Sequence, residues 1–165
     1  MAVTYENIST TTLGSTQSSI VFSSIPQTYT DLVLVSFAQH TGDASTGDAN
    51  LRFNSDSSAL YSVNGFYGYG SGSTGYTQTN KTFMKWTYAA TNYKPLVIAN
   101  IMNYSNSTTY KTMLMRANRA DSATGATVAL WRNTNPITQI FVQCLSFNSN
   151  QFTVIRKRPK PMLRS

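Results

Sequence analysis

The side chains that usually carry catalysis or bind metals are scarce in this sequence. The chain has one histidine, one cysteine and six acidic residues, namely His40, Cys144, Glu6, Asp31, Asp43, Asp48, Asp56 and Asp121. A zinc site needs about four His or Cys ligands, and a nucleophile needs a base held beside it. Because Cys144 lies in residues 139–145, which read as a strand, we expect its thiol to be a small apolar group of the core.

The remaining polar patterns do not assemble a catalytic site either. Asp43, Asp48, Asn50 and Asp56 lie within fourteen residues, but their spacing matches no EF-hand and is typical of a solvated loop. The acids suffice in number for a glycosidase pair, and His40 for a Ser-His-Asp triad, yet no local motif supports either chemistry. No phosphate-binding loop or dinucleotide fingerprint occurs. We therefore predict a protein that is not an enzyme and binds no cofactor or metal.

The positive charge is concentrated at the C-terminus. Of the 13 basic residues that give a net charge of +7, five lie in residues 156–165, namely Arg156, Lys157, Arg158, Lys160 and Arg164. The other eight nearly balance the six acids, so the rest of the chain is close to neutral. Because Pro159 and Pro161 disfavour a helix, we expect an extended basic arm. Such an arm binds phosphates, docks on an acidic neighbouring protein, or only aids solubility.

The composition predicts an all-β fold. Ser, Thr and Asn make up 57 of 165 residues, and the sequence adds ten Tyr and eight Phe. These residue types suit strands and turns and disfavour helices. No apolar run approaches the 18 residues of a membrane span, and the N-terminus shows no signal-peptide pattern. The length suits one domain, which we assign to residues 1–155.

Short runs of strand-forming residues, separated by turn residues, recur along the chain. They lie at residues 4–12, 18–22, 31–38, 51–54, 60–63, 81–90, 96–104, 109–116, 127–131, 137–147 and 152–155. The run 31–38 is largely apolar on both faces, as expected of a central strand, and 103–108 and 148–150 read as tight connections. This spacing predicts an antiparallel β-sandwich, with jelly-roll topology ahead of an immunoglobulin-like one.

Residues 64–80 read as a Gly/Ser/Tyr-rich loop. Together with the preceding strand residues they present five aromatic side chains, namely Tyr61, Phe66, Tyr67, Tyr69 and Tyr76. Rigid aromatic faces beside small adaptable residues are typical of binding loops, and such faces stack on sugars, on bases or on a partner's side chains. The alternative is a flexible loop whose aromatic rings fold back on the sandwich.

Several segments together resemble a family of bacteriophage structural proteins that is common in phages of cyanobacteria and other aquatic bacteria. The matching segments are 10–14 (Thr-Thr-Thr-Leu-Gly), 20–26 (Ile-Val-Phe-Ser-Ser-Ile-Pro), 29–35 (Tyr-Thr-Asp-Leu-Val-Leu-Val), 51–54 (Leu-Arg-Phe-Asn) with Tyr61, Leu130-Trp131, Asn133-Thr134 and 137–140 (Ile-Thr-Gln-Ile). The resemblance implies a virion protein with a jelly-roll-like sandwich and no catalytic residues. Family members commonly end in a short final strand resembling Ser-Leu-Tyr-Gly, whereas here residues 152–155 lead into the basic arm.

Two functions agree with this resemblance. The first is a capsid decoration (cement) protein, a trimer on the virion surface whose arm contacts the major capsid protein. The second is a tail or fibre module that binds host cell-surface carbohydrate through the aromatic loop. A weaker third interpretation has the arm contact DNA, with affinity that falls steeply with salt. The sequence favours the first, and we expect neither nucleic acid nor a membrane as partner.

Overall fold

The computed structural model describes residues 5–41, 49–87, 94–119 and 123–157, and these confirm the all-β prediction. They form eleven strands: β1 (Tyr5–Thr12), β2 (Gln17–Phe22), β3 (Asp31–Thr41), β4 (Ala49–Phe53), β5 (Tyr61–Tyr69), β6 (Gly72–Lys81), β7 (Met84–Thr87), β8 (Leu96–Met102), β9 (Lys111–Arg119), β10 (Ala123–Trp131) and β11 (Ile140–Lys157). Among the described residues, none belongs to a helix long and apolar enough to cross a membrane.

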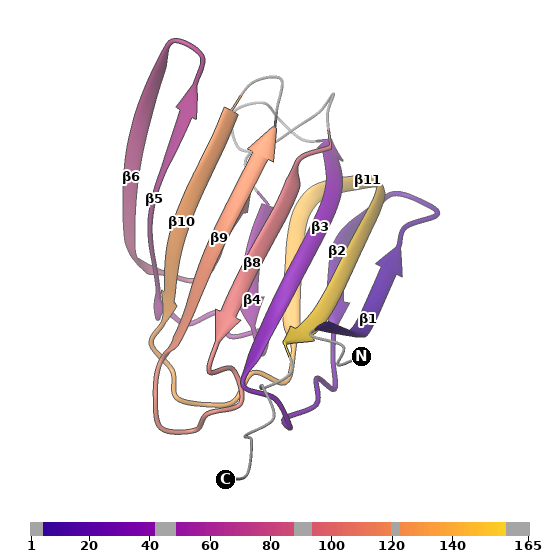
Figure 1. Ribbon diagram of the computed structural model, residues 1–165, viewed down its shortest axis with the longest axis vertical. Helices are drawn as coiled ribbons and strands as arrows, with labels where there is room; N and C mark the ends of the chain where they lie inside the picture. The colour runs from indigo at the N-terminus through magenta and orange to yellow at the C-terminus, as the bar shows by residue number, and fades with distance from the viewer. Residues whose placement is uncertain (1–4, 42–48, 88–93, 120–122, 158–165) are drawn as a thin grey trace, which may run out of the picture.

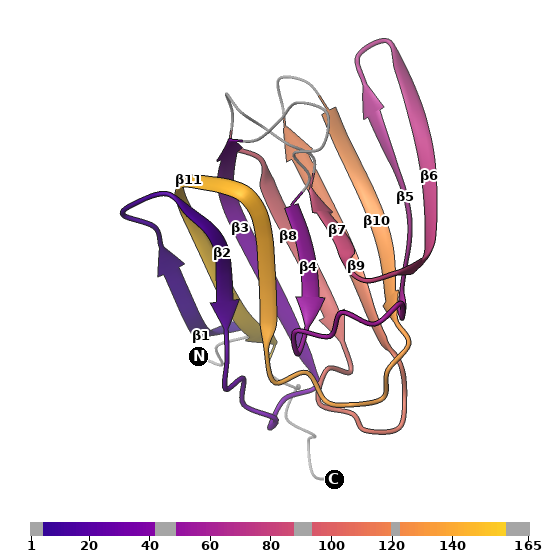
Figure 2. The ribbon, with the colours of Figure 1, turned by 180° about the vertical axis from the view of Figure 1, so that it is seen from behind.

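The strands form two antiparallel sheets that pack face to face. The larger sheet has the order β6-β5-β10-β9-β8-β3-β11-β1, and the smaller one has the order β7-β4-β11-β2. Figure 1 shows the larger sheet in front. Figure 2 shows the molecule from the opposite direction, with the smaller sheet in front. The predicted sandwich is therefore confirmed, and one strand, β11, belongs to both layers.

β11 turns the corner between the sheets. Residues 140–143 pair with β2 and β4 of the smaller sheet, and residues 151–157 pair with β1 and β3 of the larger one. Between these two stretches the register with β2 and β3 shifts, and such irregularities let a strand bend and change sheets. The predicted tight connection at 148–150 is therefore wrong, because the chain stays in strand conformation through the bend.

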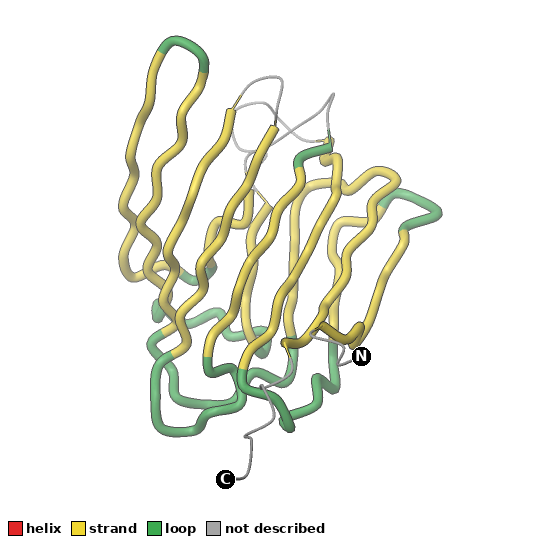
Figure 3. The backbone as a smooth tube through the Cα atoms, viewed as in Figure 1, coloured by secondary structure: helices red, strands yellow, loops and turns green. Residues whose placement is uncertain are grey.

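The order of the connections is that of a jelly roll. From β1 to β4 the chain changes sheet at every step, and it does so again from β7 to β8 and within β11. Two antiparallel pairs, β5–β6 and β9–β10, are inserted into this scheme and widen the larger sheet. Figure 3 shows that the long connections among the described residues gather at one end of the sandwich. This alternation between two sheets is what distinguishes a jelly roll from a simple meander.

Asparagine side chains fix two connections at that end. Asn54 has a φ of 51°, and its amide Nδ2 donates to the carbonyl of Pro136 at 2.8 Å. Its Oδ1 accepts from the backbone N–H of Thr138 at 2.8 Å. The predicted connection at 103–108 is confirmed, because Asn106 Oδ1 accepts the N–H of Thr108 at 2.7 Å in the local turn that Asn favours.

The core lies between the two sheets and contains several large aromatic side chains. Trp86, Trp131, Tyr61, Tyr104 and Phe53 are fully buried there. A buried hydroxyl in an apolar layer needs a hydrogen-bond partner. Ser36 has one, because the indole N–H of Trp86 donates to its Oγ at 3.2 Å.

Gly65 lets the β5–β6 hairpin close against β10. On neighbouring strands, Gly65 pairs with Tyr76 and with Thr127. The Tyr76 ring crosses the space above Gly65, and its hydroxyl forms a hydrogen bond with Thr127 Oγ1 at 2.9 Å. A Cβ at position 65 would lie 2.7 Å from Thr127 Oγ1 and 2.9 Å from the Tyr76 ring. The aromatic ring thus takes the place of the missing side chain.

We predict that Gly65→Ala destabilises the protein by about 1–3 kcal/mol, because the added methyl overpacks a filled site. Gly75→Ala is the matched control on the adjacent strand, where a Cβ would meet its nearest atom at 3.7 Å, an ordinary contact. We expect this control to stay within about 0.5 kcal/mol of the parent. Urea unfolding measures both values, and equal values for the two variants would contradict this explanation.

Candidate functional site

The predicted aromatic loop is a β-hairpin. Residues 61–69 and 72–81 pair as β5 and β6 with a two-residue connection, so the prediction of an irregular loop at 64–80 was wrong. Figure 1 shows the hairpin at the edge of the larger sheet, extending beyond its neighbours. Its pairing with β10 holds it in place along residues 61–69. The hairpin thus presents its aromatic residues on a regular framework in which alternate side chains point to opposite faces.

Two of the five aromatic residues have structural roles. Tyr61 is fully buried, its ring stacks on Trp131 with centroids 6.2 Å apart, and its hydroxyl accepts the Phe53 N–H at 3.2 Å. The expectation that Tyr61 contacts a partner is therefore wrong, because the inward face of β5 places it in the core. Tyr76 is partly buried over Gly65, and Lys85 Nζ lies 5.8 Å from its ring centroid.

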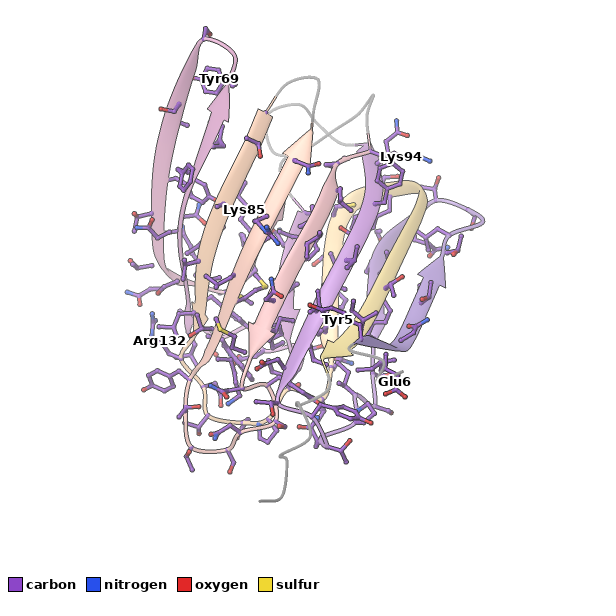
Figure 4. The ribbon with its side chains drawn as sticks, in the orientation of Figure 1. Tyr5, Glu6, Tyr69, Lys85, Lys94 and Arg132 are labelled. Carbon is purple, nitrogen blue, oxygen red and sulfur yellow. The ribbon has the colours of Figure 1, made fainter. Side chains whose placement is uncertain are left out.

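The other three aromatic residues lie on two opposite sides of the hairpin. Tyr67 and Tyr69 share the side on which Tyr61 lies, with ring centroids 5.8 Å apart and planes at 37°. Tyr69 is 43% exposed, and Figure 4 places it near the free end of the hairpin. Phe66 points the other way and is 62% exposed. The structure thus pairs two of the predicted rings and separates Phe66 from them.

A second surface, which the sequence analysis missed, covers the outer side of the larger sheet. We call it the apolar outer face, and it comprises Val35, Phe37, Phe66, Leu96, Ile98, Leu114, Ala126 and Val128. The four most exposed of these, Phe66, Phe37, Val128 and Leu114, are 44–62% exposed. No described element packs on this side of the sheet, which faces the viewer in Figure 1.

The apolar outer face extends across five strands, with Arg116 of β9 and Asn100 of β8 lying among its members. The strand register sets Phe66 beside Ala126, and it sets Val128 beside Leu114. It also sets Ile98 beside Val35 and Leu96 beside Phe37. Directly opposed side chains lie about 4.5–5.5 Å apart at Cβ, and diagonal ones are close enough for large side chains to touch. Large exposed apolar residues grouped in this way are typical of contact surfaces, unlike singly scattered ones.

Two cations lie on and beside this surface. Arg116 is exposed, lies between Ala126 and Ile98 in the strand register, and lines a shallow groove of about 330 Å³ together with Phe66 and Ile98. Lys94 Nζ lies 5.9 Å from the centroid of the Phe37 ring. A surface that combines aromatic and aliphatic groups with an arginine has the composition of the centre of protein–protein interfaces.

The structure changes the start of the basic arm. Arg156 and Lys157 are the last two residues of β11, where they pair with Glu6 and Tyr5 of β1 and with Leu32 and Asp31 of β3. The predicted boundary after residue 155 is therefore too early, because both neighbouring strands continue the sheet to Lys157. Arg158, Lys160 and Arg164 lie outside the described residues, as do Asp43, Asp48 and Asp121.

Cys144 has the predicted core position. It is 7% exposed, and burial raises the pKa of its thiol to about 12. A thiol with so high a pKa is a poor nucleophile at neutral pH. Within the described part of the chain, no group of three or more His, Cys, Asp or Glu residues gathers to hold a metal ion. The side chain of His40 lies outside the description.

Asp56 organises the connections at the end of the sandwich. Its Oδ1 accepts the Ser58 N–H at 2.9 Å, and its Oδ2 accepts the Trp131 indole N–H at 2.8 Å and the Asn133 amide at 3.5 Å. Partial burial raises the pKa of this carboxyl, but hydrogen bonds from Ser58, Trp131 and Asn133 together lower it below its ordinary value. The carboxylate therefore holds two loops against the core and has a structural role.

The chain matches no protein-family model, and no curated protein matches it at a significant level. The two surfaces described above, namely the apolar outer face and the Tyr67–Tyr69 pair, therefore carry the functional argument together with the sequence resemblance.

We predict that Asp56→Asn lowers the free energy of unfolding by about 1 kcal/mol at pH 7, because charge-assisted hydrogen bonds become neutral ones. The folded pKa lies below the unfolded one, so this stabilisation is present above the unfolded pKa and is lost as pH falls through the folded pKa. The difference in the free energy of unfolding between variant and parent should therefore become smaller below about pH 4. Asp31→Asn, which removes the charge from a carboxylate that accepts a single backbone N–H, that of Asn103, is the control. A pH-independent difference in urea unfolding would contradict this role.

Proposed function

We propose that this chain is a non-enzymatic structural protein of a bacteriophage virion. Its role is that of a capsid decoration (cement) protein, which binds the outer surface of the shell and stabilises it. The partner is the major capsid protein, and the contact is the apolar outer face. The observation that carries the proposal is this broad, exposed and largely apolar surface with Arg116 at its centre.

The composition of the apolar outer face supports a protein partner. Phe37, Phe66, Leu114 and Val128 expose large apolar areas that water solvates poorly. Arg116 lies on this face and Lys94 lies beside it, and both side chains are exposed and cationic. Such a surface suits a partner with an apolar patch and matching carboxylates, because complementary charges set the register of an interface. Nucleic acid would instead require a dense array of cations.

Repetition on a shell makes this mode of binding effective. A capsid presents many equivalent copies of one partner, so a modest affinity at each contact is sufficient when copies are linked. The sequence resemblance to phage structural proteins supports the virion as the location, and jelly rolls recur among capsid proteins. We propose that the cations from Arg158 onward add contacts to acidic residues of the shell.

A tail or fibre module that binds host cell-surface carbohydrate is the second candidate function. One specific observation favours it: the rings of Tyr67 and Tyr69 form a tilted pair, and Tyr69 is 43% exposed near the free end of the hairpin. Paired aromatic faces of this kind stack on sugar rings, and a regular hairpin holds them with little loss of entropy. In this alternative the basic arm anchors the module to the tail.

We predict that Val128→Asp weakens binding to capsids that lack this protein by about 100-fold, since it places an unpaired charge in a desolvated contact. Val21→Asp is a matched control. Val21 is 45% exposed and Val128 is 48% exposed, but Val21 lies on β2 of the smaller sheet. The control should stay within about threefold of the parent, because an exposed substitution of this kind has little effect on stability. Cosedimentation measures the binding, and equal behaviour of the two variants would contradict the proposal.

The double variant Tyr67→Ala/Tyr69→Ala separates the two functions. As a cement protein it should bind capsids within about threefold of the parent, because neither residue belongs to the apolar outer face. Tyr110→Ala, which removes a 54% exposed ring from a different part of the chain, is the control. If the parent and the control adhere to host cells and the double variant does not, the carbohydrate function replaces the cement function.

A further inference from the structure

β6 is an open edge of the larger sheet. It pairs with β5, and no other described strand lies against it. All of its ten residues are exposed except Tyr76 and Gln78, which are partly buried. An edge strand presents a row of unpaired N–H and C=O groups, which is a template for another strand. Figure 1 shows that the hairpin stands at the margin of the molecule, where another strand has access.

The other three edges carry features that discourage strand addition. β1 contains Glu6 and a register shift between Asn7 and Ser9. β7 is only four residues long and contains Lys85, and β2 has six residues. Short strands, charges and bulges are the usual protection of edges against unwanted pairing.

β6 lacks this protection over most of its length. It has ten residues, no proline, and no charge before Lys81 at its end. Its register shift lies at that same end, between the pairs Tyr61–Lys81 and Val63–Gln78. Threonines at 74, 77 and 79 favour strand conformation. The edge that is least protected is therefore also the longest one.

We propose that β6 pairs with β6 of a second copy of this chain, antiparallel and about a two-fold axis perpendicular to the sheet. Such an axis keeps the outer faces of both copies on one side and centres the register on a residue. Centring it on Thr77 sets Thr77 against the partner's Thr77, a favourable cross-strand pair. The register shift between Gln78 and Lys81 of each copy then lies at the two ends of the pairing. A two-fold contact of this type is self-complementary.

The charges agree with this arrangement. In the proposed register each Lys81 lies opposite Ser73 of the other copy, where no charge stands. Because positions 73 and 81 are eight residues apart along the strand, the two lysines are about 27 Å apart, and their repulsion is screened. Uncharged Thr, Gln, Asn, Gly and Tyr residues fill the positions between them. The result is one continuous sheet that presents two apolar outer faces side by side.

Introducing a charge at position 77 tests the pairing. Thr77→Lys or Thr77→Glu places two like charges opposite each other, and we expect each variant alone to weaken the dimer at least about tenfold. Mixing the two variants should restore pairing, because the opposed charges then attract. Thr124→Lys is the control. Thr124 is an exposed threonine of the same sheet, but it lies on β10 between β5 and β9 and away from the edge.

Light scattering after size exclusion gives the mass. The parent and Thr124→Lys should show twice the chain mass of 18.2 kDa, each Thr77 variant alone should show 18.2 kDa, and their mixture should again show the doubled mass. A parent that is a monomer or a trimer would overturn the pairing, as would doubled mass in the Thr77→Lys variant alone. This test concerns the β6 edge and is independent of what the apolar outer face binds.

Discussion

Backbone pairing along β11 is the constraint on which the rest of the structure depends. The first part of this strand lies between β2 and β4, and its last part lies between β1 and β3, so the ladders of both sheets meet in one segment. Ile140, Val142 and Phe147 are fully buried along it and fix the spacing of the layers. β3, paired with the end of β11, then sets the register for β8, β9, β10 and β5 in turn. The position of the hairpin thus depends on a strand on the opposite side of the sheet.

The two-layer arrangement and the unequal size of the two sheets leave two parts of the larger sheet uncovered by the described elements, its outer side and the β5–β6 hairpin. A sheet in a two-layer sandwich buries one face, and the smaller sheet covers only part of the inner side of the larger one. The β5–β6 hairpin extends beyond that cover, which leaves Tyr69 exposed on the inner side. On the outer side no described element covers Leu114, Val128 and Phe37. The fold thereby leaves a broad, largely apolar face and a strand edge exposed, and its described residues gather no metal-binding cluster.

The sequence predicted the local structure well where composition and turns decide it. Strand-forming residues and Asn-rich connections located most strands, including the turn at 103–108 that Asn106 stabilises. The hairpin was missed because Gly, Ser and Thr at 64–80 carry little apolar alternation, and Gly65 makes sense only once Tyr76 fills its place. The bend of β11 depends on pairing with residues more than a hundred positions away, which no local pattern contains. The apolar outer face did leave a signal: β3 is apolar on both sides, and a two-layer sandwich can bury only one of them.

Immunogold electron microscopy of intact virions, with an antibody against this chain, tests the central claim most directly. The cement function requires the protein wherever its shell partner is exposed, and shell subunits cover the entire head. We therefore predict label distributed over the whole surface of the head. Label confined to one pole or to the tail would contradict the proposed contact with the shell and favour the Tyr67–Tyr69 pair as the functional surface.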